Sequence, residues 1–220
     1  QITGDGALSV AADANLGNGA GALALNNGQL TTTGAFSSSR DITLTNTGII
    51  STGNTLTLSG AITGTGGLTK TGSSTLTLSG ISNTYSGTTT VSAGTLQAGS
   101  VNAFSSSSAI SLANTAGVVL ELNGNDNTIA NLAGGGTTGG NVTLGAGTLT
   151  VGNGSSTTYT GAITGTGGLT KQGTGTLALN GTNNTYSGTT TVSAGVLQAG
   201  AANAFSPSSA VSLASIDGVV

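Results

Sequence analysis

Thr55-Leu-Thr-Leu-Ser-Gly60 recurs further along the chain as Thr75-Leu-Thr-Leu-Ser-Gly80. After one more step of the same length, the leucine returns in Gly94-Thr-Leu-Gln97. Alternation of Thr with Leu turns one face of a strand inward and the other outward. A unit of about 20 residues is too short to bury its own apolar face, but stacked units share a core. The pattern therefore predicts a solenoid whose leucine ladder consists of Leu56, Leu76, Leu96 and, in a later copy, Leu177 and Leu197.

A longer repeat encloses this step. Residues 60–119 align with residues 161–220 without a gap, at an offset of 101 residues. The segment from Gly60 to Lys70 returns unchanged from Gly161 to Lys171. We therefore expect one continuous solenoid over residues 1–220, with long units at 60–160 and 161–220, the second truncated, and a related spacer repeat at 1–59.

The composition favours short strands over helices. Thr, Val and Ile favour extended backbone, whereas Gly, Asn and Ser permit tight corners. We expect an all-β solenoid of roughly eleven coils, a rod about 50 Å long at about 4.8 Å per coil. A second ladder is expected to pair Leu68-Thr-Lys70 with Thr88-Thr-Thr90. Between Leu96 and Thr148 the register loosens, which predicts longer corner loops at 123–127 and 134–140. The best helical segment, Ser9 to Leu16, is expected to form a turn at most.

Two other structural classes, a disordered chain and a different all-β fold, fit parts of the pattern. A disordered Gly/Ser/Thr tract is disfavoured because 35% of the residues are hydrophobic, they are regularly spaced, and the net charge is only −3. A β-sandwich or open barrel also has many short strands, but it has a larger aromatic core than three Phe and three Tyr provide. A thin core of Leu, Val, Ile and Ala suits a narrow solenoid better.

The ionic residues are few: 4% of the chain is charged, and only three residues, Arg40, Lys70 and Lys171, are cations. Nucleic-acid binding needs clustered Lys and Arg, so we expect no nucleic-acid partner. The chain has no cysteine, so its stability must come from burial and hydrogen bonds. We expect neither a signal peptide after Gln1 nor a transmembrane helix, since no charged-then-apolar leader and no run of about 18 apolar residues is present.

One group of side chains is a candidate cation site. Glu121 and Asp126, with Asn123, Asn125 and Asn127 beside them, offer carboxylate and amide oxygens of the kind that hold a cation. An Asn-rich solvated corner explains the same residues, and this interpretation is favoured. Nucleophilic catalysis lacks a base because the chain has no His. We therefore expect no catalytic, cofactor or metal site.

Several repeated polar residues have two interpretations. Lys70 and Lys171 are expected at the rod surface, where they aid solubility, although they could also guide an anionic ligand or a glycan. Tyr85 and Tyr186 are expected to pack over the next coil with their hydroxyls reaching solvent, with sugar stacking as the alternative. Thr88-Thr-Thr90 and Thr189-Thr-Thr191 are expected to point outward, as in ordinary strands. An ice-binding face is disfavoured because Thr does not recur in this way on every coil.

The ordered phrases of the chain resemble a known family. Gly64-Thr-Gly-Gly-Leu-Thr-Lys-Thr-Gly72, Asn83-Thr-Tyr-Ser-Gly87 and Ala93-Gly-Thr-Leu-Gln97 are similar to the passenger-associated repeat of bacterial autotransporters, and Gly165 to Gln198 matches again. The resemblance implies a right-handed, single-stranded parallel β-helix passenger on the bacterial surface. It also implies that a C-terminal membrane β-barrel translocator exports the passenger, with this chain a segment of a longer array.

We therefore expect a non-enzymatic stalk or adhesin passenger of type V secretion, exposed on the cell surface or secreted. Its repeats would support sequential folding during export, because each coil templates the next. Its partners would be a host-cell or glycan ligand, the translocator and other copies of itself. The alternatives are a self-assembling extracellular filament subunit and a polysaccharide-active β-helix enzyme.

Overall fold

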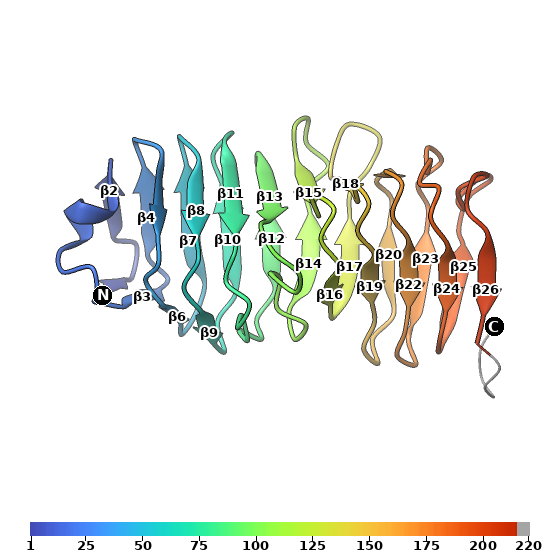
Figure 1. Ribbon diagram of the computed structural model, residues 1–220, viewed down its shortest axis with the longest axis horizontal. Helices are drawn as coiled ribbons and strands as arrows, with labels where there is room; N and C mark the ends of the chain where they lie inside the picture. Colours follow the sequence, from blue (N-terminus) through green and yellow to red (C-terminus); the bar gives the residue numbers. More distant parts are fainter. Residues whose placement is uncertain (215–220) are drawn as a thin grey trace.

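The computed structural model describes residues 1–214, which form one rod of stacked parallel strands (Figure 1). The expected all-β solenoid is confirmed. Its longest sheet has ten strands, which mark about ten turns rather than eleven. The difference arises because later coils are longer: the steps from Thr95 to its partner Val119, and from Val119 to Asn141, exceed the earlier step from Thr75 to Thr95. Residues 215–220, with Asp217 and the end of the second long unit, lie outside the described part of the chain.

Each coil crosses three faces, which we number in the order in which the chain visits them. Face 1 holds two sheets, β1 (Ile2–Thr3), β3 (Leu23–Asn26), β6 (Ile42–Leu44) and β9 (Ile62–Gly64), then β16 (Asn127–Ile129), β19 (Leu149–Val151), β22 (Leu169–Lys171), β24 (Thr190–Val192) and β26 (Val211–Leu213). Face 2 holds β2 (Ala7–Val10), β4 (Gln29–Thr32), β7 (Gly48–Thr52), β10 (Leu68–Thr71), β12 (Thr89–Val91), β14 (Ala109–Leu112), β17 (Asn131–Gly134), β20 (Thr157–Tyr159), β23 (Thr176–Leu179) and β25 (Val196–Ala199). Face 3 holds β5 (Phe36–Ser38), β8 (Leu56–Leu58), β11 (Thr75–Leu78), β13 (Thr95–Ala98), β15 (Val119–Glu121), β18 (Asn141–Thr143) and β21 (Ile163–Thr164).

Face 1 is interrupted between β9 and β16, where two coils cross it without forming a strand. Backbone hydrogen bonds still connect these coils, from Thr84 N to Ile62 O and from Asn102 N to Asp126 O, both 2.9 Å. The amide of Asn83 also donates to Ala103 O, 2.6 Å away. The two sheets of face 1 therefore lie in one stack, separated by an irregular stretch two coils deep.

Alternation of inward and outward residues builds the core. The leucine ladder is confirmed, since Leu56 pairs with Leu76 and Leu76 with Leu96. The second ladder is shifted by one residue from the expected register, because Leu68 pairs with Thr89 rather than Thr88. The corner from Thr89 to Thr95 is one residue shorter than the corner from Leu68 to Thr75, so the regular step is restored on face 3.

Helical structure is limited to one turn, as expected. Within residues 1–214 it consists of η1, a 3-10 helix at Asp13–Leu16. In the same range, no helix has the length and hydropathy needed to cross a membrane. The expected corner loops lie where the strands stop, between β15 and β16 and between β17 and β18.

The long repeat does not span a whole number of coils. β9 on face 1 corresponds, one long repeat later, to β21 on face 3. In the same way, β10 on face 2 corresponds to β22 on face 1, and β11 on face 3 to β23 on face 2. The second copy is therefore displaced by five coils less one face, so equivalent residues lie on different sides of the rod.

Corner glycines permit the close stacking of coils, which gives a first prediction. A Cβ placed on Gly66 would overlap the carbonyl oxygen of Asn46 in the coil before it, whereas a Cβ on Gly19 would meet nothing within 4 Å. Gly66→Ala should lower the free energy of unfolding by roughly 2 kcal/mol, because the backbone must shift to relieve the clash. Gly19→Ala is the matched control and should leave the urea midpoint within error. Equal midpoints for the two variants would contradict this account of the corners.

Candidate functional site

The most distinctive polar groups of the repeat lie inside the rod. Lys70 is fully buried, and its ammonium donates to three carbonyl oxygens, those of Thr71 (2.9 Å), Gly72 (2.8 Å) and Ala93 (2.9 Å). Two of these acceptors belong to its own coil, and Ala93 belongs to the next. The three donors of an ammonium group are thus all used, which offsets the cost of burying the charge. Burial lowers the pKa of Lys70 to about 8, so the ammonium persists at neutral pH.

Lys171 repeats this arrangement one face round the rod. It is 1% exposed and donates to the carbonyl oxygens of Gln172, Gly173 and Ala194. The expectation that both lysines lie at the surface was wrong. The signal was present in the sequence, because alternation in Leu68-Thr-Lys70 puts Lys70 on the same side as the buried Leu68.

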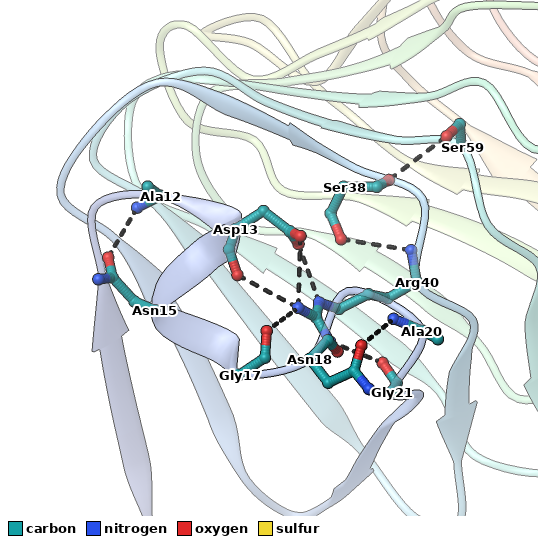
Figure 2. Close-up of polar contacts among 10 residues, drawn as sticks. All are labelled: Ala12, Asp13, Asn15, Gly17, Asn18, Ala20, Gly21, Ser38, Arg40 and Ser59. Carbon is teal, nitrogen blue, oxygen red and sulfur yellow. Dashed lines mark hydrogen bonds and ion pairs between the residues drawn. The ribbon is translucent and has the colours of Figure 1, made fainter.

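Arg40 is the third buried cation, 3% exposed. It forms an ion pair with Asp13, whose Oδ1 lies 2.9 Å from Nε. Its guanidinium also donates to the carbonyl oxygens of Gly17 (2.9 Å) and Gly21 (2.9 Å) and to that of Asn18, so it fastens η1 and the loop that follows it (Figure 2). The planar guanidinium has enough donors to satisfy several carbonyls at once. Arg40 therefore closes the corner of the rod over its N-terminal coil.

Tyr85 begins a buried chain of hydroxyl groups. Its hydroxyl lies 2.8 Å from Thr89 Oγ1, which lies 2.8 Å from Ser108 Oγ. Ser108 donates its proton to the carbonyl oxygen of Gly87, 2.7 Å away, so it must accept from Thr89, and Thr89 from Tyr85. Burial raises the pKa of Tyr85 to about 12. The second copy builds the same chain from Tyr186, Thr190, Ser209 and Gly188.

These contacts correct two expectations. Tyr85 and Tyr186 do pack within the rod, but their hydroxyls face Thr89 and Thr190 rather than solvent. Thr89 and Thr190 are themselves fully buried, so the Thr triplets do not form outward rows. The shift of one residue in the β10–β12 register is the cause, since it turns the middle Thr of each triplet inward.

Asn83 joins three consecutive coils through its side chain. Its Oδ1 accepts from the backbone N–H of Ile62 (2.7 Å), in the preceding coil. Its Nδ2 donates to Gly80 O (3.1 Å) within its own coil and to Ala103 O (2.6 Å) in the next. Asn184 makes the equivalent bonds in the second copy, to Ile163, Gly181 and Ala204. No role was predicted for either Asn from the sequence, although both lie in the repeated phrase.

At the suspected cation corner, one oxygen of each carboxylate accepts a hydrogen bond. Glu121 Oε2 accepts from Gln97 Nε2 (2.9 Å), and Asp126 Oδ1 accepts from Thr148 N (2.7 Å). The side chains of Asn125 and Asn127 bond to nearby backbone groups, and Asn123 adopts a left-handed turn conformation with φ of 50°. The geometry is that of a hydrogen-bonded corner. Among residues 1–214, no three His, Cys, Asp or Glu side chains are grouped as metal ligands.

The chain is similar in sequence to known proteins. The sequence profile of the passenger-associated-transport-repeat family matches residues 68–98 and 169–199, the two segments that contain the buried Lys, Asn and Tyr. The chain is also similar to the "Adhesin BmaC autotransporter" of Brucella suis biovar 1 (strain 1330), with 45% identity over 164 residues. That alignment covers 71% of this chain but only 5% of the BmaC protein, so the chain spans a small part of its relative. No solved structure gives a significant match. The resemblance seen in the sequence is thereby confirmed.

Removal of the buried ammonium gives a second prediction. Lys70→Met fills a similar volume but removes the ammonium donors of three carbonyl oxygens, so it should lower the free energy of unfolding by roughly 3 kcal/mol. Tyr85→Phe, which removes only the terminal donor of the hydroxyl chain, should cost about 1 kcal/mol. Urea unfolding followed by circular dichroism measures both. A Lys70→Met protein as stable as the parent would show that the buried charge contributes nothing to the fold.

The Arg40 corner predicts a pH dependence. The hydrogen bond from Arg40, with a smaller contribution from Ser38, lowers the pKa of Asp13 below its ordinary value of 3.8. The Asp13 carboxylate therefore stabilises the corner fully above that value, and this stabilisation is lost as the pH falls through the lowered pKa. The protection factors of the Gly17 and Gly21 amides should fall below about pH 4, whereas those of a distant strand should not.

Asp13→Asn provides the control for this effect. In this variant the Gly17 and Gly21 amides should already be less protected at pH 7 than in the parent protein. Their protection factors should then change little between pH 7 and pH 3. Unchanged protection of both glycines across this range in the parent protein would rule out the ion pair as the fastener.

Proposed function

We propose that this chain, which carries two passenger-associated transport repeats and is related to an autotransporter, is part of an exported stalk that presents or supports adhesive regions on the bacterial surface. The observation that carries the proposal is the inward position of the lysine, the asparagine and the tyrosine that recur in both copies of the repeat. Lys70, Asn83 and Tyr85 spend their hydrogen bonds on the rod itself, so the repeat is built for folding rather than for chemistry. The relative is named as an adhesin, which supports a role in attachment.

The proposed role of the repeat is to fix the register in which coils stack. The strand sequences are nearly interchangeable, because a Thr-Leu-Thr-Leu segment keeps its inward leucines after a slip of two residues. Buried polar groups do not tolerate such a slip. Lys70 must meet Ala93 O, and Asn83 must meet both Ile62 N and Ala103 O. A wrong register leaves these groups buried without partners, at a cost of several kcal/mol.

This register control suits an exported chain. A solenoid can fold by adding one coil to the edge left by the last, since each coil contacts chiefly its neighbours. The polar groups of each repeat bond to the coil before or after their own. A newly added coil therefore satisfies these groups only if it docks in the correct register. We propose that the chain crosses the outer membrane unfolded through a translocator of the full-length protein and then folds coil by coil outside the cell.

A refolding experiment tests this proposal. Hydrogen exchange is pulse-labelled during refolding of the parent protein, Lys70→Met and Lys171→Met, two variants with the same chemistry at different coils. Each variant should delay protection of the region around its own lysine, residues 62–98 for Lys70→Met and residues 163–199 for Lys171→Met. Because later coils dock on earlier ones, the variant whose coil folds first should delay both regions, whereas the other variant should delay only its own. A single rate for all amides, changed equally by both variants, would refute sequential folding.

The same purified protein distinguishes the other two functions. A filament subunit would form fibres whose amount increases with protein concentration in electron micrographs, whereas a stalk would stay as single rods. A polysaccharide-active enzyme would release reducing ends from glycans, whereas we propose a non-catalytic chain. Fibre formation would support the filament subunit, and release of reducing ends would support the enzyme; either would contradict the proposed stalk.

A further inference from the structure

An open recess of about 470 Å³ lies on face 1, where the chain crosses the rod without forming strands. Its lining comes from three successive coils: Ile81, Ser82, Asn83, Thr84, Asn102, Phe104, Ser106 and Thr128. The volume falls within the usual range for small-ligand sites. The recess lies between β9 and β16, which are separated by two coils without a strand.

The frame of the recess is held rigidly by buried bonds. Asn83 is fixed by its three hydrogen bonds to neighbouring coils, and the Phe104 N–H donates to Asn127 Oδ1, 3.0 Å away. Phe104 is only 2% exposed and forms an apolar floor. A site held in one shape before binding loses little conformational freedom when a ligand arrives.

The surface of the recess is rich in free hydroxyl groups. Ser82, Thr84, Ser106 and the amide of Asn102 are exposed, and Thr128 is partly exposed. None of these five side chains has a hydrogen-bond partner within the described chain, whereas the neighbouring Ser105 and Ser108 are bonded to carbonyls. Ile81, 74% exposed, supplies an apolar wall beside them.

Charge excludes one class of ligand. All three cations of the chain are buried and bonded to carbonyl oxygens, so no cationic side chain is exposed to pair with a carboxylate, sulfate or phosphate. Asp126, whose backbone carbonyl accepts from Asn102 N (2.9 Å), is exposed beside the recess and would repel anions. Hydroxyl and amide groups around an apolar wall fit a molecule with many hydroxyls, apolar C–H faces and no charge.

We propose that this recess binds a neutral oligosaccharide. The proposal assigns a ligand class to the stalk and rests on the proposed surface location for its access to cell-surface glycans. The hydroxyls of Ser82, Thr84, Ser106 and Thr128 exchange hydrogen bonds with sugar hydroxyls, and Ile81 packs against a sugar ring. The exposed side chains of the recess would thus bind the ligand, while the buried side chains beneath them hold the coils in register.

The second repeat supplies a variant that the fold already accepts. At the equivalent positions it keeps Asn184, Asn203 and Phe205 but has Thr182, Asn183 and Pro207 in place of Ile81, Ser82 and Ser106. The triple substitution Ile81→Thr, Ser82→Asn, Ser106→Pro therefore changes the surface of the recess and preserves its frame. Asn183→Ser, at the position equivalent to Ser82, makes a similar change away from the recess.

The whole chain is first applied to an array of neutral and sialylated or sulfated glycans. The tightest neutral glycan is then titrated into labelled protein while amide chemical shifts are followed. We expect neutral glycans to bind, shifts to centre on residues 81–84 and 102–106, and the triple variant to weaken binding by about tenfold or more. Asn183→Ser should bind like the parent protein.

Three results would overturn the proposal: no neutral glycan bound, equal binding by the triple variant, or shifts centred elsewhere on the rod. Binding of acidic glycans alone would also do so. Unchanged circular dichroism and urea midpoints verify that each variant is folded. A failure here leaves coil-by-coil folding intact, since that proposal is judged by the refolding rates of Lys70→Met and Lys171→Met, which involve no glycan.

Discussion

The parallel backbone hydrogen bond between successive coils is the constraint on which this structure depends. It holds neighbouring strands about 4.8 Å apart on every face, so the interior is narrow and each buried group can reach only its own coil and the ones beside it. Apolar residues meet this constraint by stacking in ladders, as Leu56, Leu76 and Leu96 do. Polar residues meet it by bonding to the carbonyls and amides of adjacent coils.

The same constraint limits the acceptors that a buried charge can reach to its own coil and the adjacent ones. A buried lysine is costly unless all three of its donors are satisfied, and Lys70 finds its acceptors in two coils. The cost of a misplaced coil is therefore high even though the strands are similar. We propose that stability and register have different sources in this rod, with the leucines supplying much of the stability and the buried polar groups fixing much of the register.

Much of the fold is predictable from the sequence, but the site is less so. Strict alternation and a regular repeat step predict the solenoid, and the departures from that step between Leu96 and Thr148 predict the longer corners. Lys70 and Thr89 were misplaced because charge and hydroxyl groups usually indicate the surface, whereas here the strand period decided the side on which they lie. The one-residue shift that buries Thr89 depends on the lengths of two corners, which strand patterns do not encode. The recess was not predictable, because it results from the absence of strands in two adjacent coils.

The displacement of the long repeat by one face has a mechanical and a geometric consequence. If every copy sat on the same side, the rod would have one side with the irregular corners and two without them, and it would bend more easily in one direction. Because β10 and β22, or Lys70 and Lys171, lie on different faces, the irregularities are distributed around the axis. Any feature carried once per repeat is then presented at successive angles along the rod. The two copies in this chain therefore place equivalent residues on two of the three faces of the rod.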